Sequence, residues 1–136
     1  MRWLMLASAG VLVLTVACSN LPTVTRTGAV KDVVIGDQLT PTELMVNAGD
    51  EVRWINKRNA PVRVVFLDGV WNRLSCNNGF GGLTVKSGSA SLDPNETASI
   101  CFKNPGFYRY TIRMESGSTK DELNAPGAIR VGDMGS

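Results

Sequence analysis

The chain has 136 residues, which is enough for one domain. Lys and Arg total 14 and Asp and Glu total 12, a formal net charge of +2, so the chain lacks the strongly basic surface of nucleic-acid-binding proteins and we expect no nucleic-acid partner. It has no histidine. This excludes Ser-His-Asp and Cys-His catalysis, and metal centres that need imidazole ligands.

The N-terminal residues have the pattern of a secretion signal. Arg2 is followed by an apolar run of thirteen residues, Leu4 to Val16. A membrane-spanning helix needs about 20 residues, so the run is too short to span and instead fits the apolar core of a signal peptide. We therefore predict that residues 1–17 are a signal peptide, absent from the mature protein.

The end of this run, Leu14-Thr15-Val16-Ala17-Cys18, resembles a bacterial lipobox. The resemblance implies that Cys18 is acylated, for example with palmitate, and becomes the mature N-terminus. Ser19 after the cysteine favours the outer membrane, with the domain facing the periplasm. The partner at this end is then a membrane, reached through the lipid anchor and a polar tether over residues 18–28. The alternative is ordinary cleavage after Ala17 without a lipid.

The remaining chain is predicted to be all-β. Short alternating runs bounded by Gly, Pro, Asn and Asp predict strands at 30–35, 44–46, 51–56, 62–66, 98–102, 107–113 and 128–131. Seven or eight such strands predict a β-sandwich. The Gly-, Asn- and Ser-rich stretch 69–90 is predicted to be a long loop or insertion. Its aromatic residues, Trp71 and Phe80, either cover the end of the sandwich or are exposed for a partner.

Two cysteines remain after Cys18, namely Cys76 in the irregular stretch and Cys101 on a predicted strand. An oxidising compartment favours a disulfide between them. Two alternatives are a Cu(I) site made by these thiols with a methionine, and free thiols. The methionines available are Met45, Met114 and Met134.

The order and spacing of these segments resemble the cupredoxin family, of the plastocyanin and pseudoazurin type. The matching residues are Leu44, Val46, Ala48-Gly49-Asp50, Val52, Trp54, Asn56, Pro61-Val62, Val64, Phe66, Leu92, Pro94, Glu96, Phe102, Pro105-Gly106, Tyr108, Tyr110, Gly127, Ile129 and Val131. The resemblance implies a Greek-key β-sandwich of seven to eight strands over residues 29–133, followed by a tail at 134–136.

The resemblance also implies copper electron transfer, but the positions of the ligands disagree with it. Val62 stands where the family has a histidine, and Ile112 stands where it has the ligand cysteine. Residues 113–126 contain no histidine, and their only sulfur is that of Met114, two residues after Ile112. Both aliphatic residues are in phase with core positions of their strands. We therefore expect hydrocarbon in place of the copper pocket, and no cofactor.

Four cations, Lys57, Arg58, Arg63 and Arg113, are expected near the end of the sandwich where the family binds copper and docks redox partners. They form either a partner-binding patch or an ordinary charged surface. We interpret the chain as a non-enzymatic, copper-free envelope lipoprotein, a binding or structural module with an unidentified protein partner, in the setting of a redox or metal-handling complex. The alternative is a copper-binding or electron-transfer cupredoxin that uses an atypical sulfur site.

Overall fold

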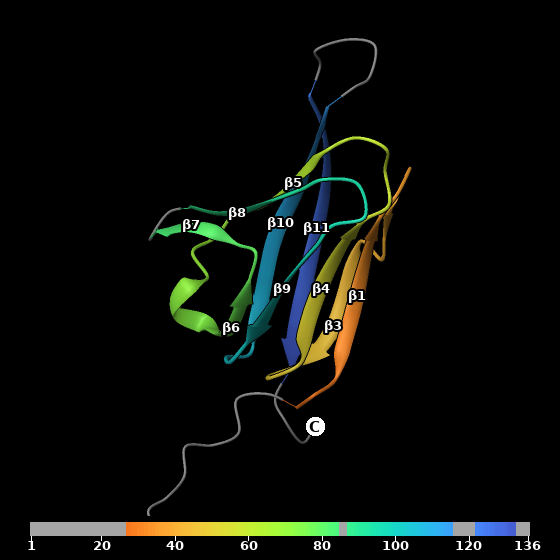
Figure 1. Cartoon of the computed structure of the whole chain (residues 1–136). Coiled ribbons are helices and arrows are strands. Elements are labelled where there is room, and N and C mark those ends of the chain that lie inside the picture. The colour runs from red at the N-terminus through yellow and green to blue at the C-terminus, as the bar shows by residue number, and fades with distance from the viewer. Residues whose placement is uncertain (1–26, 85–86, 116–121, 133–136) are drawn as a thin grey trace, which may run out of the picture.

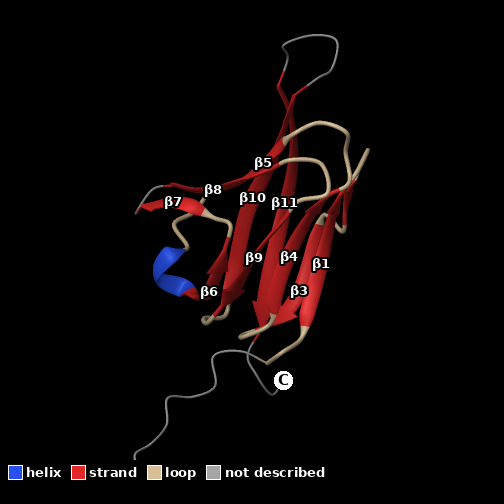
Figure 2. Cartoon of the chain, in the orientation of Figure 1, coloured by secondary structure: helices blue, strands red, loops and turns tan. Residues whose placement is uncertain are grey.

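A computed structural model describes residues 27–84, 87–115 and 122–132. The predicted signal peptide, most of the tether and the tail at 134–136 lie outside the described residues. In the described part the chain forms eleven strands and one turn of 3-10 helix at Trp71–Arg73 (Figures 1 and 2). No helix within these ranges is long and apolar enough to span a membrane.

The strands form two sheets that pack face to face, which confirms the predicted all-β sandwich (Figure 2). Sheet A has the order β2-β1-β4-β9-β6, and sheet B has the order β3-β11-β10-β5-β8-β7. The strands of sheet A are β1 (Val30–Ile35), β2 (Leu39–Thr40), β4 (Glu51–Asn56), β6 (Leu74–Asn78) and β9 (Thr97–Phe102). Those of sheet B are β3 (Glu43–Asn47), β5 (Val62–Phe66), β7 (Gly81–Thr84), β8 (Ser87–Leu92), β10 (Gly106–Glu115) and β11 (Glu122–Gly132).

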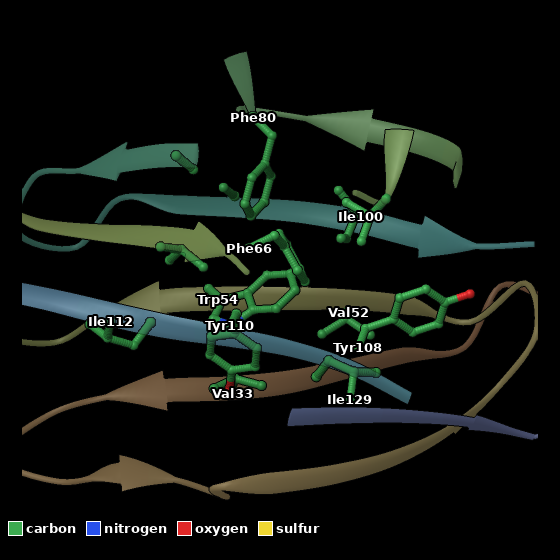
Figure 3. Packing of buried hydrophobic residues seen from close by; sticks show 14 of the residues in the cluster. Val33, Val52, Trp54, Phe66, Phe80, Ile100, Tyr108, Tyr110, Ile112 and Ile129 are labelled. Carbon is green, nitrogen blue, oxygen red and sulfur yellow. The ribbon is translucent and has the colours of Figure 1, made fainter. Parts of the chain in front are cut away.

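The core follows from the alternation of apolar residues along the strands, because successive side chains point to opposite faces of a sheet. In β4 the residues Val52, Trp54 and Asn56 are buried, and in β5 Val62, Val64 and Phe66 are buried. Aromatic rings fill the centre, as Figure 3 shows. Trp54 lies edge-on to Tyr110 and Phe80, with ring centroids 5.4 Å apart in both pairs.

The prediction of a loop at 69–90 is wrong for most of that stretch. Its residues form β6 at the edge of sheet A, and β7 and β8 at the edge of sheet B. Together with the short β2, these strands raise the number above the predicted seven or eight. The small residues of this stretch have little strand propensity of their own, and pairing with β9 and β5 holds them extended. Phe80 is buried, so it covers the core as the first alternative expected, while the side chain of Trp71 lies outside the described part.

The two ends of the sandwich differ (Figure 1). At one end, which we call the tether pole, the chain enters at Thr27 beside the turn 47–50 and the turn 105–106. The Thr27 amide donates a hydrogen bond to the Gly49 carbonyl at 3.0 Å. At the other end, which we call the distal pole, lie the loop 57–61 and the turn 93–96, at the top of Figure 1.

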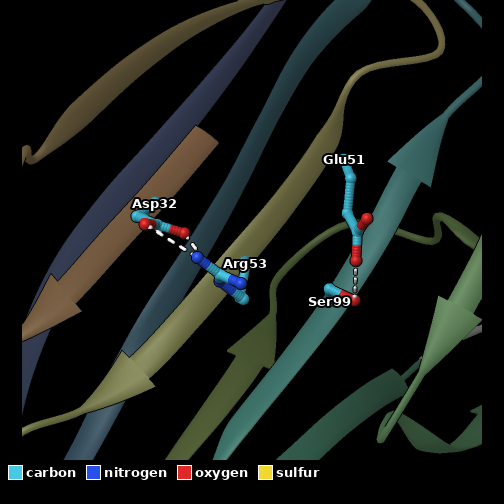
Figure 4. A network of polar contacts seen from close by, with 4 residues as sticks. All are labelled: Asp32, Glu51, Arg53 and Ser99. Atoms are coloured by element: carbon cyan, nitrogen blue, oxygen red, sulfur yellow. Dashed lines mark hydrogen bonds and ion pairs between the residues drawn. The ribbon is translucent and has the colours of Figure 1, made fainter. Parts of the chain in front are cut away.

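The outward face of sheet A carries polar contacts between neighbouring strands (Figure 4). Arg53 donates two hydrogen bonds to Asp32, at 2.8 and 3.0 Å, and the Ser99 hydroxyl donates to Glu51 at 2.6 Å. Both pairs join β4 to its two neighbours in the sheet. The Arg53–Asp32 pair is about 40% exposed, so it fixes register more than it stabilises the fold.

Candidate functional site

The two positions that the cupredoxin resemblance assigns to copper ligands lie in the core near the distal pole. Val62 is 3% exposed and Ile112 is 0% exposed. Val62 pairs with Leu92 on one side and Met114 on the other, and Ile112 pairs with Val64 and Ala125. Side chains from four strands thus form two aliphatic rows across sheet B. Ile112 lies beside the aromatic core in Figure 3.

These residues do not fit a copper ion, because copper in proteins takes imidazole, thiolate or thioether ligands. Val62 and Ile112 have only carbon at their side-chain ends. Met114 is half-buried and packs against the core beside Val62. One thioether among aliphatic side chains is not a copper site. No group of three His, Cys, Asp or Glu residues that could hold a metal occurs among the residues described.

Asn56 organises the loops of the distal pole. It is fully buried at the end of β4, and its amide nitrogen donates to the carbonyls of Ala60 at 2.9 Å and Leu92 at 3.0 Å. Its side-chain oxygen accepts from the Arg58 amide at 3.0 Å. The turn is tied back by the Asn95 amide, which donates to the Asn56 carbonyl at 2.7 Å. The loop and the turn are therefore tied to the end of β4 by hydrogen bonds from one side chain and its own main chain.

Asn56 is among the residues that resemble cupredoxins, but the sequence interpretation assigned it no structural role, although a signal for one was present. In the alternation along β4, the polar residue Asn56 is on the same buried face of the strand as Val52 and Trp54. Buried polar groups are nearly always hydrogen-bonded, so a polar side chain in that phase predicts a structural bond network.

The disulfide between Cys76 and Cys101 is confirmed. The sulfur atoms are 2.08 Å apart and the Cα atoms 4.8 Å apart, across the pairing of β6 with β9. Cys101 is on the opposite face of β9 from the core residues Ile100 and Phe102, as its alternation predicted. The bond fastens the edge strand β6 to the sheet, and it leaves neither sulfur as a thiolate for a metal.

The four predicted cations differ in the elements that carry them and in the contacts that they make. Arg63 and Arg113 are direct cross-strand partners on β5 and β10, and both are exposed on the outward side of sheet B. Arg58 instead turns toward the start of the β1–β2 connection, where its Nη1 donates to the Gly36 carbonyl at 3.2 Å. Lys57 is exposed next to it. The cations thus form two pairs, of which only Arg63 and Arg113 share a sheet face.

Tyr110 and Trp54 are both fully buried, and neither the phenol oxygen nor the indole nitrogen has a hydrogen-bond partner of good geometry within the described ranges. Burial raises the pKa of Tyr110 to about 12, and a weak polar interaction with Trp54 acts in the opposite direction. Opposite the Tyr110 ring, β11 has Gly127, where a Cβ atom would lie 2.5 Å from the phenol oxygen. The Tyr110 ring can therefore occupy this position only because residue 127 has no side chain.

No protein-family model and no curated protein matches the chain. Solved structures of amicyanin do match. A variant of amicyanin in its Cu(I) form has 25% identity and a TM-score of 0.54, and the match covers 77% of this chain and 83% of that one. A reduced variant has 21% identity and a TM-score of 0.55, with 77% and 84% covered. The described domain therefore has a cupredoxin-like fold, in which the positions expected to bind copper hold buried aliphatic side chains.

Proposed function

We propose that the protein is a copper-free, cupredoxin-like lipoprotein of the bacterial envelope. It acts as a non-enzymatic binding or structural module, anchored through Cys18, and serves a redox or metal-handling complex. The observation that carries the proposal is the burial of Val62 and Ile112, at 3% and 0% exposure, where the resemblance expects nitrogen and sulfur ligands.

The energetics of the distal pole support this proposal. Burial of an aliphatic side chain contributes about 1.5–3 kcal/mol, so Val62 and Ile112 stabilise the fold where a metal would otherwise hold the loops. The side chain of Asn56 makes three hydrogen bonds that fix the same loops. This end of the domain can therefore fold without a metal ion.

The chemistry of the sulfurs also supports the proposal over a copper site made of cysteines. Copper binding by Cys76 and Cys101 needs both thiols in the reduced state, whereas the fold brings the two sulfurs to bonding distance. Reduction of a bond that fastens β6 to β9 would loosen the edge of sheet A.

The surface offered to a protein partner is the outward side of sheet B near the distal pole. There Arg63 and Arg113 lie side by side, with Ser91 and Asn124 as their other strand neighbours. Two cations directly across a strand pair form a small positive surface that attracts an acidic partner. Cations of this kind raise the rate of encounter more than the affinity.

Copper reconstitution of the full chain, extracted from membranes, tests the proposal. The protein is incubated with Cu(II), and separately with Cu(I) under reducing conditions, then desalted and measured for bound metal and visible absorption. We expect far less than one copper per chain and no intense visible band. The intact mass is measured first, because it reports acyl chains on Cys18 and the loss of two hydrogens at the disulfide.

One copper per chain with an intense visible band would overturn the proposal. Two variants then identify the site. If Cys76→Ser with Cys101→Ser abolishes copper uptake, the atypical sulfur site is correct. If Met114→Leu abolishes it, the pole that holds Val62 binds metal despite its hydrocarbon lining. An unmodified mass at Cys18 would refute the anchor while leaving the copper result intact.

A further inference from the structure

A groove opens at the tether pole between the free edges of the two sheets. Its volume is about 270 Å³, and its lining residues are Lys31, Met45, Val46, Asn47, Asp50, Arg130 and Gly132. It lies between residues 30–33 of β1 and the end of β3. The outer edge of these β1 residues, opposite β4, pairs with none of the described strands. Two of the lining residues are cations, from different sheets.

The position of the chain's entry brings this groove close to any membrane that holds Cys18. The Thr27 hydroxyl donates to the Asp50 carboxylate, and the same carboxylate accepts from the Asn47 amide at 2.9 Å. The chain is thus fixed beside the groove from Thr27 onward. The nine residue steps from Cys18 to Thr27 span about 30 Å when fully extended.

Two cations line the groove, and the carboxylates beside them already accept hydrogen bonds from the protein. Lys31 is exposed and shares the inward phase of Val33 and Ile35, so its side chain extends toward the gap between the sheets. Arg130 uses its Nε to meet Glu43 at 3.0 Å, and its guanidinium carries further N–H donors. The acidic lining residue, Asp50, is 3% exposed and is engaged by the donors from Thr27 and Asn47.

Apolar side chains flank the cation on the adjoining surface. Met45 and Phe107 are the cross-strand partners of Arg130 on either side, and they are 73% and 47% exposed. The Arg130 guanidinium lies over the Phe107 ring, 4.9 Å from its centroid. Single exposed apolar residues are common, but a cation between two apolar side chains matches the boundary between headgroups and acyl chains.

We propose that the tether pole docks on the surface of the anchoring membrane, with an anionic phospholipid headgroup as the ligand of the groove. Lys31 and Arg130 bind the headgroup phosphate, and Met45 and Phe107 enter the interface. The proposal rests on the proposed lipid anchor, which brings the pole within reach of the bilayer. It leaves the distal pole and its Arg63–Arg113 pair facing away from that membrane.

Oxidation footprinting of the full lipoprotein in vesicles tests this proposal. The protein is reconstituted in phosphatidylcholine vesicles with or without phosphatidylglycerol, treated with dilute hydrogen peroxide, and analysed by mass spectrometry. We expect Met45 to be protected only when phosphatidylglycerol is present. The half-buried Met114 serves as the internal reference for oxidant dose.

Charge variants at the two poles make the test specific. Lys31→Gln with Arg130→Gln is expected to lower the ratio of docked to undocked protein roughly 30-fold, the factor that two surface cations contribute near an anionic leaflet. Arg63→Gln with Arg113→Gln removes the same charge at the distal pole and should leave protection unchanged. Equal protection in pure phosphatidylcholine, or equal loss in both double variants, would overturn the proposal.

Two further measurements distinguish membrane docking from a small-anion site and from the loss of the anchor. Inorganic phosphate added to the detergent-solubilised protein should not protect Met45, and protection by phosphate alone would show a small-anion site instead of a membrane-docking surface. The intact mass of Cys18 reports the anchor independently. An acylated protein with an unprotected Met45 refutes docking alone, whereas an unacylated Cys18 refutes the anchor.

Discussion

Gly127→Ala probes the close approach of strand β11 to the Tyr110 ring. A Cβ atom at Gly127 would lie 2.5 Å from the Tyr110 oxygen and 2.6 Å from its Cε2 atom. The ring cannot move away easily, because Tyr110 is fully buried and packs against Trp54 and Phe66 at centroid distances of 5.4 and 5.9 Å. Either the ring or strand β11 must shift.

Two effects of opposite sign decide the magnitude. Replacing glycine by alanine restricts the unfolded chain and stabilises by about 0.4–1 kcal/mol where the backbone allows it. Overpacking a well-filled core costs about 1–3 kcal/mol. The second effect is larger, so we expect Gly127→Ala to lower the free energy of unfolding by about 1–2 kcal/mol. Each kcal/mol corresponds to about 4–8 °C in Tm for a domain of this size.

Urea unfolding monitored by tryptophan fluorescence measures the change, with Gly81→Ala as the matched control. Gly81 is also in a strand of sheet B, and a Cβ atom there meets nothing within 4 Å. The control should be neutral or slightly stabilising. In a Tyr110→Ala background, Gly127→Ala should lose most of its cost, because the clashing ring is gone. Equal stabilities of Gly127→Ala and Gly81→Ala would refute this account of the core.

Three other changes have expected outcomes. Cys76→Ser with Cys101→Ser opens a link over 25 residues, and urea unfolding should show a loss of about 3.5 kcal/mol in the chain-entropy model. A loss below about 1 kcal/mol would mean that the reduced, unfolded chain stays compact near β6. Asn56→Ala leaves a buried main-chain carbonyl without its donor, so we expect a loss of about 1–3 kcal/mol and faster hydrogen exchange in the loop 57–61. Exchange unchanged in that loop would show that the side chain does not hold it. Because the Tyr110 phenol keeps its proton up to a pKa of about 12 when folded and up to about 10 when unfolded, stability is retained below pH 10 and falls as pH rises toward 12. Tyr110→Phe should remove this alkaline loss, and an identical pH profile in the variant would contradict the assignment.

The alternation of apolar and polar residues predicted most of the sandwich, since the long strands each bury one face. The run 51–56 shows this, with Val52, Trp54 and Asn56 inward. The alternation did not predict the strands at 69–90, where Ser, Gly and Asn residues are held extended by pairing with neighbouring strands and not by their own strand propensity. No local pattern in this stretch could reveal which strand edge would recruit it.

The burial of Val62 and Ile112 was predictable, because the alternation of inward and outward side chains along a strand is a local property. The directions of the four cationic side chains were not all predictable in this way. Arg63 lies within a strand, so its outward face follows from the burial of Val62 and Val64. Lys57 and Arg58 lie beyond the end of β4, where phase no longer applies. The direction of Arg58 depends on the Gly36 carbonyl, which is 22 residues away in the sequence.

The aliphatic side chains at the distal pole bear on whether the folding of its loops depends on a metal ion. A buried imidazole or thiol without its metal leaves a polar group unsatisfied, at a cost of about 1–3 kcal/mol for each such group. Val62 and Ile112 carry no such cost, and Asn56 satisfies its polar atoms within the protein. A copper-free domain of the kind we propose presents the same loops whether or not copper is present. That property suits a permanently folded docking module, whereas a carrier that must sense or exchange the ion needs loops whose stability depends on it.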